Sequence, residues 1–283
     1  MISNAGRLLV IGGGNMGSAI VRGVIAGGEA AATDVCVIEP DASRRRALAA
    51  LGVVCVADGA RMKVAWGAEA VLIAVKPQLF TRVAPVVAGA AATGSLVVSI
   101  MAGVSIAAIE RVLRAQHGQR PLRIVRVMPN LAVQVGKGAC AMFANARTTH
   151  QDRALVFLLF AALGEVYEMA EKRMNAFTAL AGSGPAYLFY LAQALQTAGV
   201  KAGFKKADAR AIVRQTLVGA AELLRKNPTS FEDLRARVTS KGGTTAAATA
   251  VLDKSGVMDA FVRAVVAARD RGAELSRLAE DEQ

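Results

Sequence analysis

Three glycines near the start of the chain have the spacing of a dinucleotide-binding fingerprint. Gly12, Gly14 and Gly17 follow a short apolar run, with Asn15 and Met16 between the last two. In this fingerprint the first glycine allows a tight turn, the second lets the backbone approach a pyrophosphate, and the third lets a helix pack closely against a strand. Free N–H groups at the start of that helix bind the anion. The spacing therefore predicts a site for a nicotinamide dinucleotide.

Charged residues after the second apolar run bear on which cofactor binds. Glu39 stands where an acidic residue commonly binds the ribose 2′-hydroxyl, which favours NADH. Arg44, Arg45 and Arg46 follow closely and offer cations for the 2′-phosphate of NADPH. The same arginines are also expected at a solvated start of a helix. The sequence therefore predicts NADPH or NADH and leaves the choice between them open.

Segments with proline, glycine or asparagine end three further apolar runs. They are residues 74–78, which include Val75, Lys76 and Pro77, residues 99–103, and residues 128–130, which end at Asn130. If these runs are parallel strands, their carboxyl ends share the edge of the sheet where α/β proteins bind ligands. Proline and glycine also simply end strands, so no one of these segments is specific alone.

A fourth segment, residues 238–245, has a different character. Ser240 is followed by Lys241, two glycines that end at Gly243, and then Thr244 and Thr245. The pattern is typical of a helix cap. It also offers hydroxyls and backbone N–H groups that can bind a carboxylate.

The elements that would position these residues alternate in the first part of the chain. Apolar, β-branched runs occur at residues 7–11, 34–38, 52–56, 70–75, 96–99 and 122–127, and helical spacing is clear at residues 15–26 and 41–50. Such runs separated by helices are typical of parallel strands buried on both faces. We therefore expect an α/β, Rossmann-type domain over residues 1–168, with a doubly wound parallel sheet.

From about residue 169 the strand pattern stops. Helical segments are expected at residues 173–198, 206–226, 231–238, 244–254 and 257–278, which gives an all-helical second domain over residues 169–283. Residues 174–200 carry no charge on any side, unlike a surface helix. Another subunit is the simplest partner to bury them. We expect a homodimer through the helical domain, with higher homo-oligomers left open.

Composition and charge argue against several other classes of protein. The net charge of +12 is compatible with nucleic-acid binding. The basic residues are not interleaved with aromatics, which make up 5% of the chain, so nucleic acid is not an expected partner. A positive field also suits an anionic cofactor and a carboxylate substrate.

The sequence argues against a membrane, a metal or a disulfide framework. Two long uncharged stretches, residues 83–109 and 174–200, are interrupted by glycine and proline, unlike membrane spans. The start of the chain lacks the basic region of a secretory signal, so a cytoplasmic location is expected. Cys36, Cys55 and Cys140 lie far apart in apolar runs and are expected to be small buried side chains. Neither they nor the two histidines have the spacing of a metal site.

The chain resembles the pyrroline-5-carboxylate reductases along nearly its whole length. In the second domain the matching pieces are LAGSGPAYLF from Leu180, QTLVGAAELL from Gln215 and VTSKGGTT from Val238. In the first domain they are AVKPQ, SIMAG and MPN…VGKG. Each piece is weak alone, and the combination is specific.

The resemblance implies a reaction and a set of roles. A hydride passes from NADPH or NADH to the carbon of a protonated C=N bond in 1-pyrroline-5-carboxylate, which gives L-proline in the last step of proline biosynthesis. Thr245 is implied to hydrogen-bond the ring nitrogen. The carboxylate is implied to bind to Ser240, Gly243 and Thr244, and the pocket floor to include Gly182, Ser183 and Gly184. The nicotinamide end of the cofactor is implied to lie near Asn130 and near Val75, Lys76 and Pro77.

Two departures from the family's usual pattern bear on the substrate. Leu131 and Ala132 stand where Thr-Pro is usual, and Lys241, where Pro is usual, adds a cation beside the implied carboxylate site. A reductase of another cyclic imino acid is therefore an alternative, as is a dinucleotide-binding module without catalysis. A β-hydroxyacid dehydrogenase is disfavoured, because Leu188 occupies the position of that family's catalytic lysine.

Overall fold

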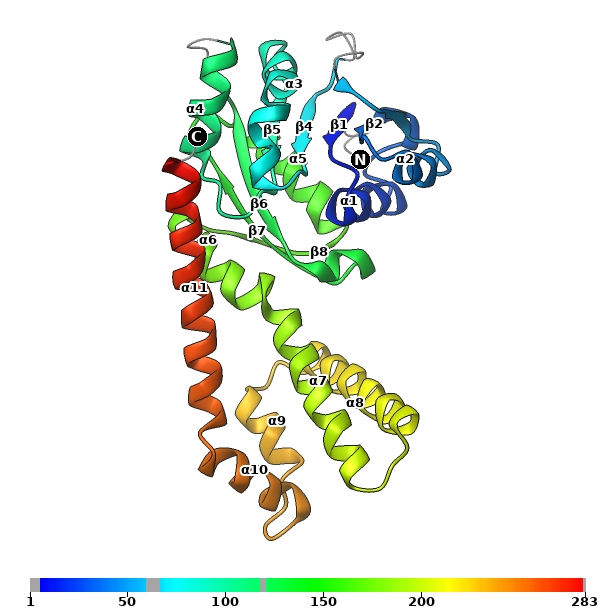
Figure 1. Ribbon diagram of the computed structural model, residues 1–283, viewed down its shortest axis with the longest axis vertical. Coiled ribbons are helices and arrows are strands. Elements are labelled where there is room, and N and C mark those ends of the chain that lie inside the picture. Colours follow the sequence, from blue (N-terminus) through cyan, green and yellow to red (C-terminus); the bar gives the residue numbers. More distant parts are fainter. Residues whose placement is uncertain (1–5, 60–66, 118–120, 282–283) are drawn as a thin grey trace. The chain divides into compact units, whose positions relative to one another are not determined.

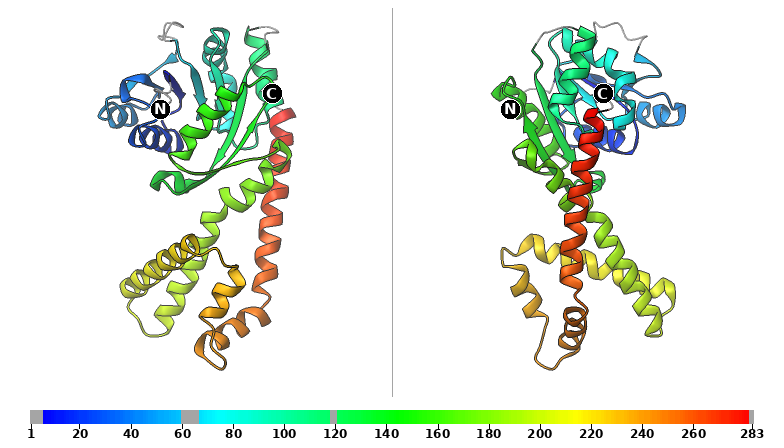
Figure 2. Two further views of the ribbon diagram at one scale, coloured as in Figure 1. Left: turned by 180° about the vertical axis from the view of Figure 1, so that it is seen from behind. Right: turned by 60° about the vertical axis from the view of Figure 1, so that its left-hand side comes forward.

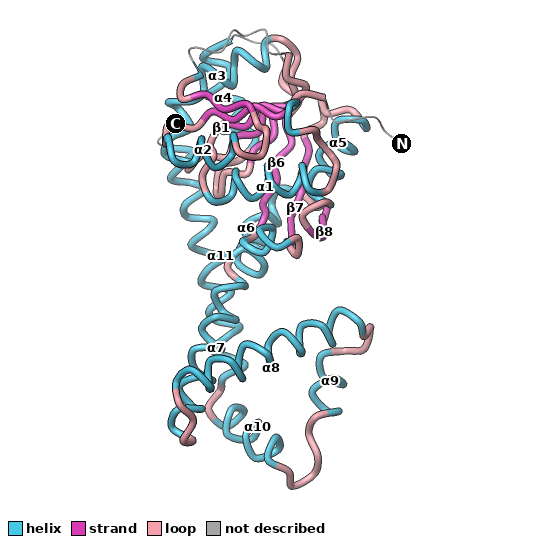
Figure 3. The backbone as a smooth tube through the Cα atoms, turned by 90° about the vertical axis from the view of Figure 1, so that its right-hand side faces the viewer, coloured by secondary structure: helices cyan, strands magenta, loops and turns pink. Residues whose placement is uncertain are grey.

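The computed structural model describes residues 6–59, 67–117 and 121–281 (Figure 1). It divides into two compact units. The first consists of Met1–Gly182 and Ala268–Gln283, and the second of Ser183–Ala267. Among the described residues, every strand lies in the first unit and the second is built from helices and loops (Figure 3). The domain assignment expected from the sequence, residues 1–168 and 169–283, remains a prediction.

An eight-stranded sheet organises the first unit, in the order β3-β2-β1-β4-β5-β6-β7-β8. Its strands are β1 (Leu8–Ile11), β2 (Val35–Ile38), β3 (Val54–Val56), β4 (Ala70–Ile73), β5 (Leu96–Ser99), β6 (Ile124–Pro129), β7 (Gly138–Ala144) and β8 (Gly164–Glu168). Neighbouring strands from β3 to β6 pair in parallel, β7 is antiparallel to β6, and β8 is parallel to β7. The expected Rossmann-type sheet is confirmed, and β7 and β8 are additions that the sequence analysis missed.

Helices cover both faces of this sheet (Figure 2). α1 (Asn15–Ala26), α2 (Ala42–Ala49) and α5 (His150–Ala161) pack on one face. α3 (Phe80–Ala92) and α4 (Ile106–His117) pack on the other. Short helices η1 (Ala32–Asp34), η4 (Pro77–Leu79) and η5 (Leu131–Val135) lie in the connections. Because β1, β4, β5 and β6 run in the same direction, their carboxyl ends meet at one edge, where ligands bind in such sheets.

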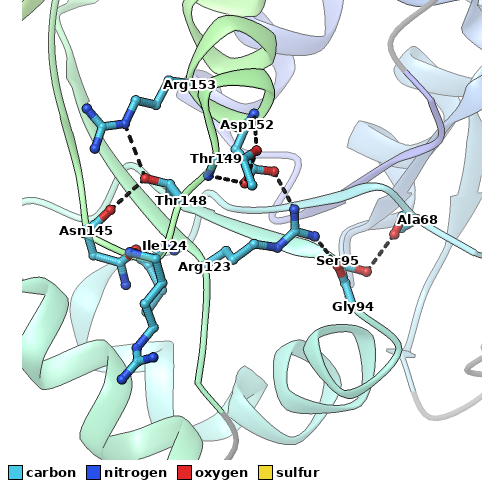
Figure 4. Close-up of polar contacts among 11 residues, drawn as sticks. Ala68, Gly94, Ser95, Arg123, Ile124, Asn145, Thr148, Thr149, Asp152 and Arg153 are labelled. Atoms are coloured by element: carbon cyan, nitrogen blue, oxygen red, sulfur yellow. Dashed lines mark hydrogen bonds and ion pairs between the residues drawn. The ribbon is translucent and has the colours of Figure 1, made fainter.

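A polar cluster holds the opposite edge of the sheet (Figure 4). Arg123, which precedes β6, has its Nη1 atom 2.6 Å from Oδ1 of Asp152 and donates a second hydrogen bond to the carbonyl of Gly94, which precedes β5. Asp152 also forms a capping box with Thr149 at the start of α5. The cluster therefore ties two strands and a helix together at the edge away from the ligand side.

The chain that leads into the helical unit is not one continuous helix. The continuous helix expected over residues 173–198 is interrupted: η6 (Glu171–Arg173), α6 (Met174–Phe177), the π-helix η7 (Thr178–Gly182) and α7 (Gly184–Lys201) follow one another. Gly182 and Gly184 weaken the helix, and Pro185 lacks the N–H that a helix interior needs but suits the first turn of a new one.

The helical unit exposes many apolar side chains. It contains α7, α8 (Lys206–Lys226), α9 (Phe231–Arg237), α10 (Thr244–Lys254) and the start of α11 (Val257–Asp281). Within residues 183–267, all of which the structure describes, Ala209 is the one apolar side chain that is buried. Leu188, Phe189 and Tyr190 on α7 are 58%, 63% and 73% exposed. Exposed apolar surface of this kind is typical of a surface that binds another protein.

The sequence predicts that neither of its two long uncharged stretches spans a membrane. Within the described part of the chain, each helix is too short or too polar to cross a lipid bilayer.

Candidate active site

The turn after β1 can be made only with glycine at two positions. Gly12 has φ +106°, and a Cβ atom there would lie 2.6 Å from the carbonyl oxygen of Ala74. A Cβ atom at Gly17 would lie 2.0 Å from the carbonyl oxygen of Gly12. Contacts this short are not tolerated, so both glycines are required by the close packing of β1, β4 and α1.

Gly14 leaves room for a ligand. It is the N-cap of α1 and provides no side-chain cap, and a Cβ atom there would meet nothing nearer than Nη1 of Arg44 at 3.9 Å. The N–H groups of the first turn, which starts with the exposed Asn15 and the half-buried Met16, therefore stay available to an anion. A hollow of about 670 Å³ opens here and continues along α1. These residues fit the pyrophosphate of a nicotinamide dinucleotide.

Glu39, which follows β2 as expected, reaches the glycine turn, and both of its carboxylate oxygens already accept hydrogen bonds. Oε2 accepts the N–H of Gly13 at 2.8 Å, and Oε1 accepts the N–H of Asp41 at 2.9 Å. The residue is 4% exposed. Glu39 therefore holds the glycine turn against the loop after β2, a role that its position alone did not reveal.

The three arginines after β2 differ in what they can reach. Arg44 has Nη1 3.9 Å from Oε1 of Glu39 and is exposed at the hollow beside Gly14. Arg45 folds back and donates to the carbonyls of Glu39 and Pro40 at 2.8 and 2.7 Å. Arg46 lies exposed in the last turn of α2. Only Arg44 of these three lines the hollow.

Val75, Lys76 and Pro77 follow β4 beside the same turn. Cγ1 of Val75 would lie 3.1 Å from a Cβ atom on Gly12. Lys76 is exposed and precedes η4, which begins at Pro77. The structure therefore brings these residues together with the glycine turn at the carboxyl edge of the sheet.

Asn130 lies at the same edge, but its side chain is turned into the protein and is 9% exposed. Its Oδ1 atom accepts the N–H groups of Ala132 and Ala139 at 3.2 and 3.1 Å. Its Nδ2 atom donates to the carbonyl of Ala181 at 3.1 Å. The Asn130 side chain, which the resemblance places near the nicotinamide, therefore makes three hydrogen bonds to backbone atoms.

The predicted carboxylate site forms a tight turn in the helical unit. Gly242 has φ +73°, and the N–H of Gly243 donates to the carbonyl of Ser240 at 3.0 Å. A Cβ atom on Gly243 would lie 2.3 Å from Oγ of Ser240. Thr244 and Thr245 form the first two positions of α10, which has no side-chain cap. The turn therefore leaves helix N–H groups and hydroxyls available to an anion.

The remaining predicted pocket residues lie where the second unit begins. Gly182 ends η7, Ser183 is the N-cap of α7, and Gly184 is its first residue. The cofactor residues named above lie in the first unit, and Ser183, Gly184 and the turn before α10 lie in the second.

One polar residue of the cofactor turn was missed by the sequence analysis. Oγ of Ser18, in the first turn of α1, donates to the carbonyl of Gly13 at 2.6 Å and so braces the loop from the helix side. A serine at this distance from the glycines carries no signal of its own, because hydroxyls are common near helix starts.

The cysteines are unsuited to covalent or metal chemistry. Burial raises the pKa of Cys36 to about 11 and that of Cys140 to about 12, so both thiols stay protonated at neutral pH. Cys55 is half-buried rather than fully buried. Among the described residues, no group of His, Cys, Asp and Glu side chains could hold a metal ion.

Known proteins match this chain over nearly its whole length. A family model for pyrroline-5-carboxylate reductase dimerisation matches residues 171–275, and one for NADP oxidoreductase, coenzyme F420-dependent, matches residues 7–103. A pyrroline-5-carboxylate reductase from Synechocystis sp. is 39% identical over 271 residues, which cover 96% of this chain and 98% of that one. The chain belongs to the pyrroline-5-carboxylate reductase family.

Solved structures of pyrroline-5-carboxylate reductases have the same fold. The enzyme from Coxiella burnetii is 33% identical, with a TM-score of 0.86 over 96% of this chain and 99% of that one. The enzyme from Plasmodium falciparum, solved with NADP bound, is 26% identical, with a TM-score of 0.80 over 95% and 98% of the two chains. The match to the dimerisation model identifies the carboxyl-terminal helical region as the one through which the chain forms a homo-oligomer.

Proposed function

We propose a division of labour between the two units for the reaction of this family. As a pyrroline-5-carboxylate reductase, the chain is an NAD(P)H-dependent oxidoreductase that converts 1-pyrroline-5-carboxylate into L-proline, the last step of proline biosynthesis. In this proposal the first unit binds the cofactor and the second binds the carboxylate of the imine. The observation that carries it is the glycine turn at Gly12–Gly17. A Cβ atom at Gly14 would meet no close neighbour, whereas one at Gly12 or Gly17 would clash with the backbone.

The glycine turn and its neighbours hold the cofactor in this proposal. The N–H groups after Gly14, including those of Asn15 and Met16, bind the pyrophosphate at the start of α1. Arg44 binds at the adenosine end, and Glu39 keeps the turn in place. Val75, Lys76 and Pro77 border the nicotinamide ribose. When bound, the cofactor supplies the hydride.

The turn before α10 holds the substrate carboxylate. The hydroxyl of Ser240 and the N–H group of Thr244 lie where the helix begins, and a helix start favours an anion. Gly243 contributes through its place in the turn, because its own N–H already donates to the carbonyl of Ser240. Lys241, exposed in the same turn, adds positive charge. Ser183 and Gly184 shape the floor of the pocket.

Thr245 acts at the ring nitrogen. Its hydroxyl can donate or accept a hydrogen bond, so it can orient the protonated imine for hydride transfer. An imine that arrives already protonated needs orientation more than a strong acid or base.

A homodimer is the smallest assembly that we propose. The apolar side chains exposed on α7 offer the surface through which two copies associate. The expected cytoplasmic location, the absence of nucleic-acid binding and any assembly beyond a dimer stay predictions.

The experiment that tests the proposal is turnover of 1-pyrroline-5-carboxylate by the purified protein with NADPH and NADH in separate assays. We expect oxidation of the cofactor with L-proline as the product. Cofactor binding without turnover would contradict the assignment of the substrate, and a screen of other cyclic imino acids would then test whether Leu131, Ala132 and Lys241 have changed it.

A further inference from the structure

Asn130 connects three backbone segments that lead away from the cofactor edge of the sheet. It follows directly after β6, and its own N–H donates to the carbonyl of Ala139 on β7 at 3.2 Å. Oδ1 accepts from Ala132 in η5 and from Ala139, so one oxygen closes the turn between the two antiparallel strands. Removal of this oxygen would leave two N–H groups without their acceptor.

The third hydrogen bond leaves this turn for a different part of the chain. Nδ2 donates at 3.1 Å to the carbonyl of Ala181, which lies 51 residues further along, in the π-helix η7. A π-helix lacks the regular hydrogen-bond pattern of an α-helix, and such segments are frequent at functional sites. Asn130 therefore gives a side-chain donor to the backbone of an irregular turn that ends at Gly182.

This hydrogen bond lies close in the chain to the start of the second unit. Ala181 lies two residues before Ser183, where the second unit begins. Packing supports the same turn, because Cε of Met128 would lie 3.4 Å from a Cβ atom on Gly182. Asn130 is buried and makes all three bonds with backbone atoms, so it is poorly placed to act as a ligand itself.

We propose that Asn130 is a positioning residue for hydride transfer. Its side chain holds the π-helix η7, which ends just before Ser183, against the carboxyl end of β6. The inference rests on the proposed function of the two units. It replaces the role near the nicotinamide that the family resemblance implied, and it assigns to Asn130 an effect on turnover without direct contact with cofactor or substrate. Errors of about 1 Å in the placement of reacting groups can cost about 100-fold in rate.

The decisive variant is Asn130→Asp. An aspartate keeps an oxygen acceptor for Ala132 and Ala139 but loses the Nδ2 donor and sets a second oxygen against the carbonyl of Ala181. We expect kcat to fall by about 100-fold, the Kd for NADPH to stay within about twofold, and the deuterium isotope effect from 4-deuterated NADPH to rise as hydride transfer becomes limiting. Faster amide hydrogen exchange across residues 178–184 is expected in the same variant.

Asn145 offers a matched control at the other end of β6. Its Oδ1 atom accepts the N–H groups of Ile124 and Arg147, and its Nδ2 atom donates to the carbonyl of Leu122 and to the carboxylate of Glu110. Asn145→Asp is expected to lower the melting temperature while kcat and the isotope effect stay close to those of the unchanged protein.

Three outcomes would overturn the inference. A raised Kd for NADPH in Asn130→Asp would make Asn130 a cofactor ligand, and a lowered melting temperature with unchanged kcat would leave it a purely structural role. Unchanged exchange at residues 178–184 would also reject it, whether or not the protein turns over the substrate. Failure of the unchanged protein to reduce 1-pyrroline-5-carboxylate would count against the proposed function instead.

Discussion

At the scale of single residues, the proposed mechanism depends on hydroxyl and charged side chains, and Thr245 is the one that it assigns to the ring nitrogen of the substrate. Thr245 is the second residue of α10, and Thr245→Val keeps the shape of its side chain but removes the hydroxyl. We expect kcat to fall by about 100-fold, the usual cost of losing one hydrogen bond that strengthens on the way to the transition state. The Kd for NADPH should be nearly unchanged. Steady-state kinetics with both substrates measures this, and an unchanged kcat would reject the role of Thr245.

Glu39 is expected to matter equally for both cofactors. In Glu39→Gln one of the N–H groups of Gly13 and Asp41 faces an amide donor in place of an oxygen, and a buried group left without a partner costs about 1–3 kcal/mol. We expect kcat/KM to fall by about tenfold with NADH and with NADPH alike. If the value for NADH falls while that for NADPH rises, Glu39 selects the ribose 2′-hydroxyl instead. Glu165→Gln, on the exposed strand β8, is the control.

Arg44 is expected to affect NADPH alone. Its guanidinium is exposed beside the open side of Gly14, and charge-assisted bonds from arginine to phosphate are strong. Arg44→Ala should lower kcat/KM for NADPH by about tenfold and leave NADH unchanged. Arg46→Ala, a matched loss of charge in the last turn of α2, should change neither value. Equal effects of both variants would indicate a general field of positive charge rather than a site.

The sequence predicted the glycine turn well because sterics leave no alternative to glycine at Gly12 and Gly17. It placed Glu39 after the second strand as a candidate for the ribose 2′-hydroxyl, but it could not show that both oxygens accept backbone N–H groups, since those bonds depend on how two loops meet. The same holds for Asn130, whose partner Ala181 is far away in sequence and lies in an irregular turn.

At the scale of elements, local sequence patterns predicted the helices better than the last strands of the sheet, β7 and β8. Residues 15–26, 206–226 and 244–254 are helical as expected, because their apolar residues recur at helical spacing. Strand β7 was missed because its sequence, GACAMFA, is rich in small residues with low strand propensity. Pairing with β6, which no local signal encodes, makes it a strand.

Asp152 supports the element that follows β7. It completes the capping box of α5 and pairs with Arg123, whose second bond holds the turn before β5. Asp152→Ala removes the cap, worth about 0.5–2 kcal/mol, and leaves a partly buried arginine without its carboxylate. We expect a loss of about 2–4 kcal/mol in the free energy of unfolding, since breaking a buried pair is more costly than breaking an exposed one. Urea denaturation measures it.

The control for Asp152 lies on a solvated helix. Asp233 occupies the equivalent third position of α9, where its N–H donates to Ser230, but it is exposed and no arginine pairs with it in the described contacts. Asp233→Ala should cost less than about 1 kcal/mol. Equal losses in the two variants would mean that an acidic residue in the first turn of a helix, and not the tie to Arg123, carries the effect.

At the scale of the whole molecule, the contrast between the two units points to assembly as a condition for activity. The sheet of the first unit buries its apolar residues on both faces, whereas those of residues 183–267 are exposed or half-buried in a single chain, apart from Ala209. A helical unit with so little core depends on a partner for its stability. The uncharged stretch at residues 174–200 predicted a homo-oligomer through the helical domain, which the match to the dimerisation model supports, although it could not show where the helix is interrupted.

Leu188→Asp tests this dependence, because it places a charge on the exposed apolar side of α7. We expect light scattering to report monomers at concentrations where the unchanged protein is oligomeric, with turnover lost. NADPH binding should be retained, because the glycine turn and Arg44 lie in the first unit, which has its own core. Phe157→Asp, at an exposed apolar position of α5, should leave the assembly unchanged. If Leu188→Asp keeps both its assembly and its turnover, this side of α7 is not the surface that joins the copies.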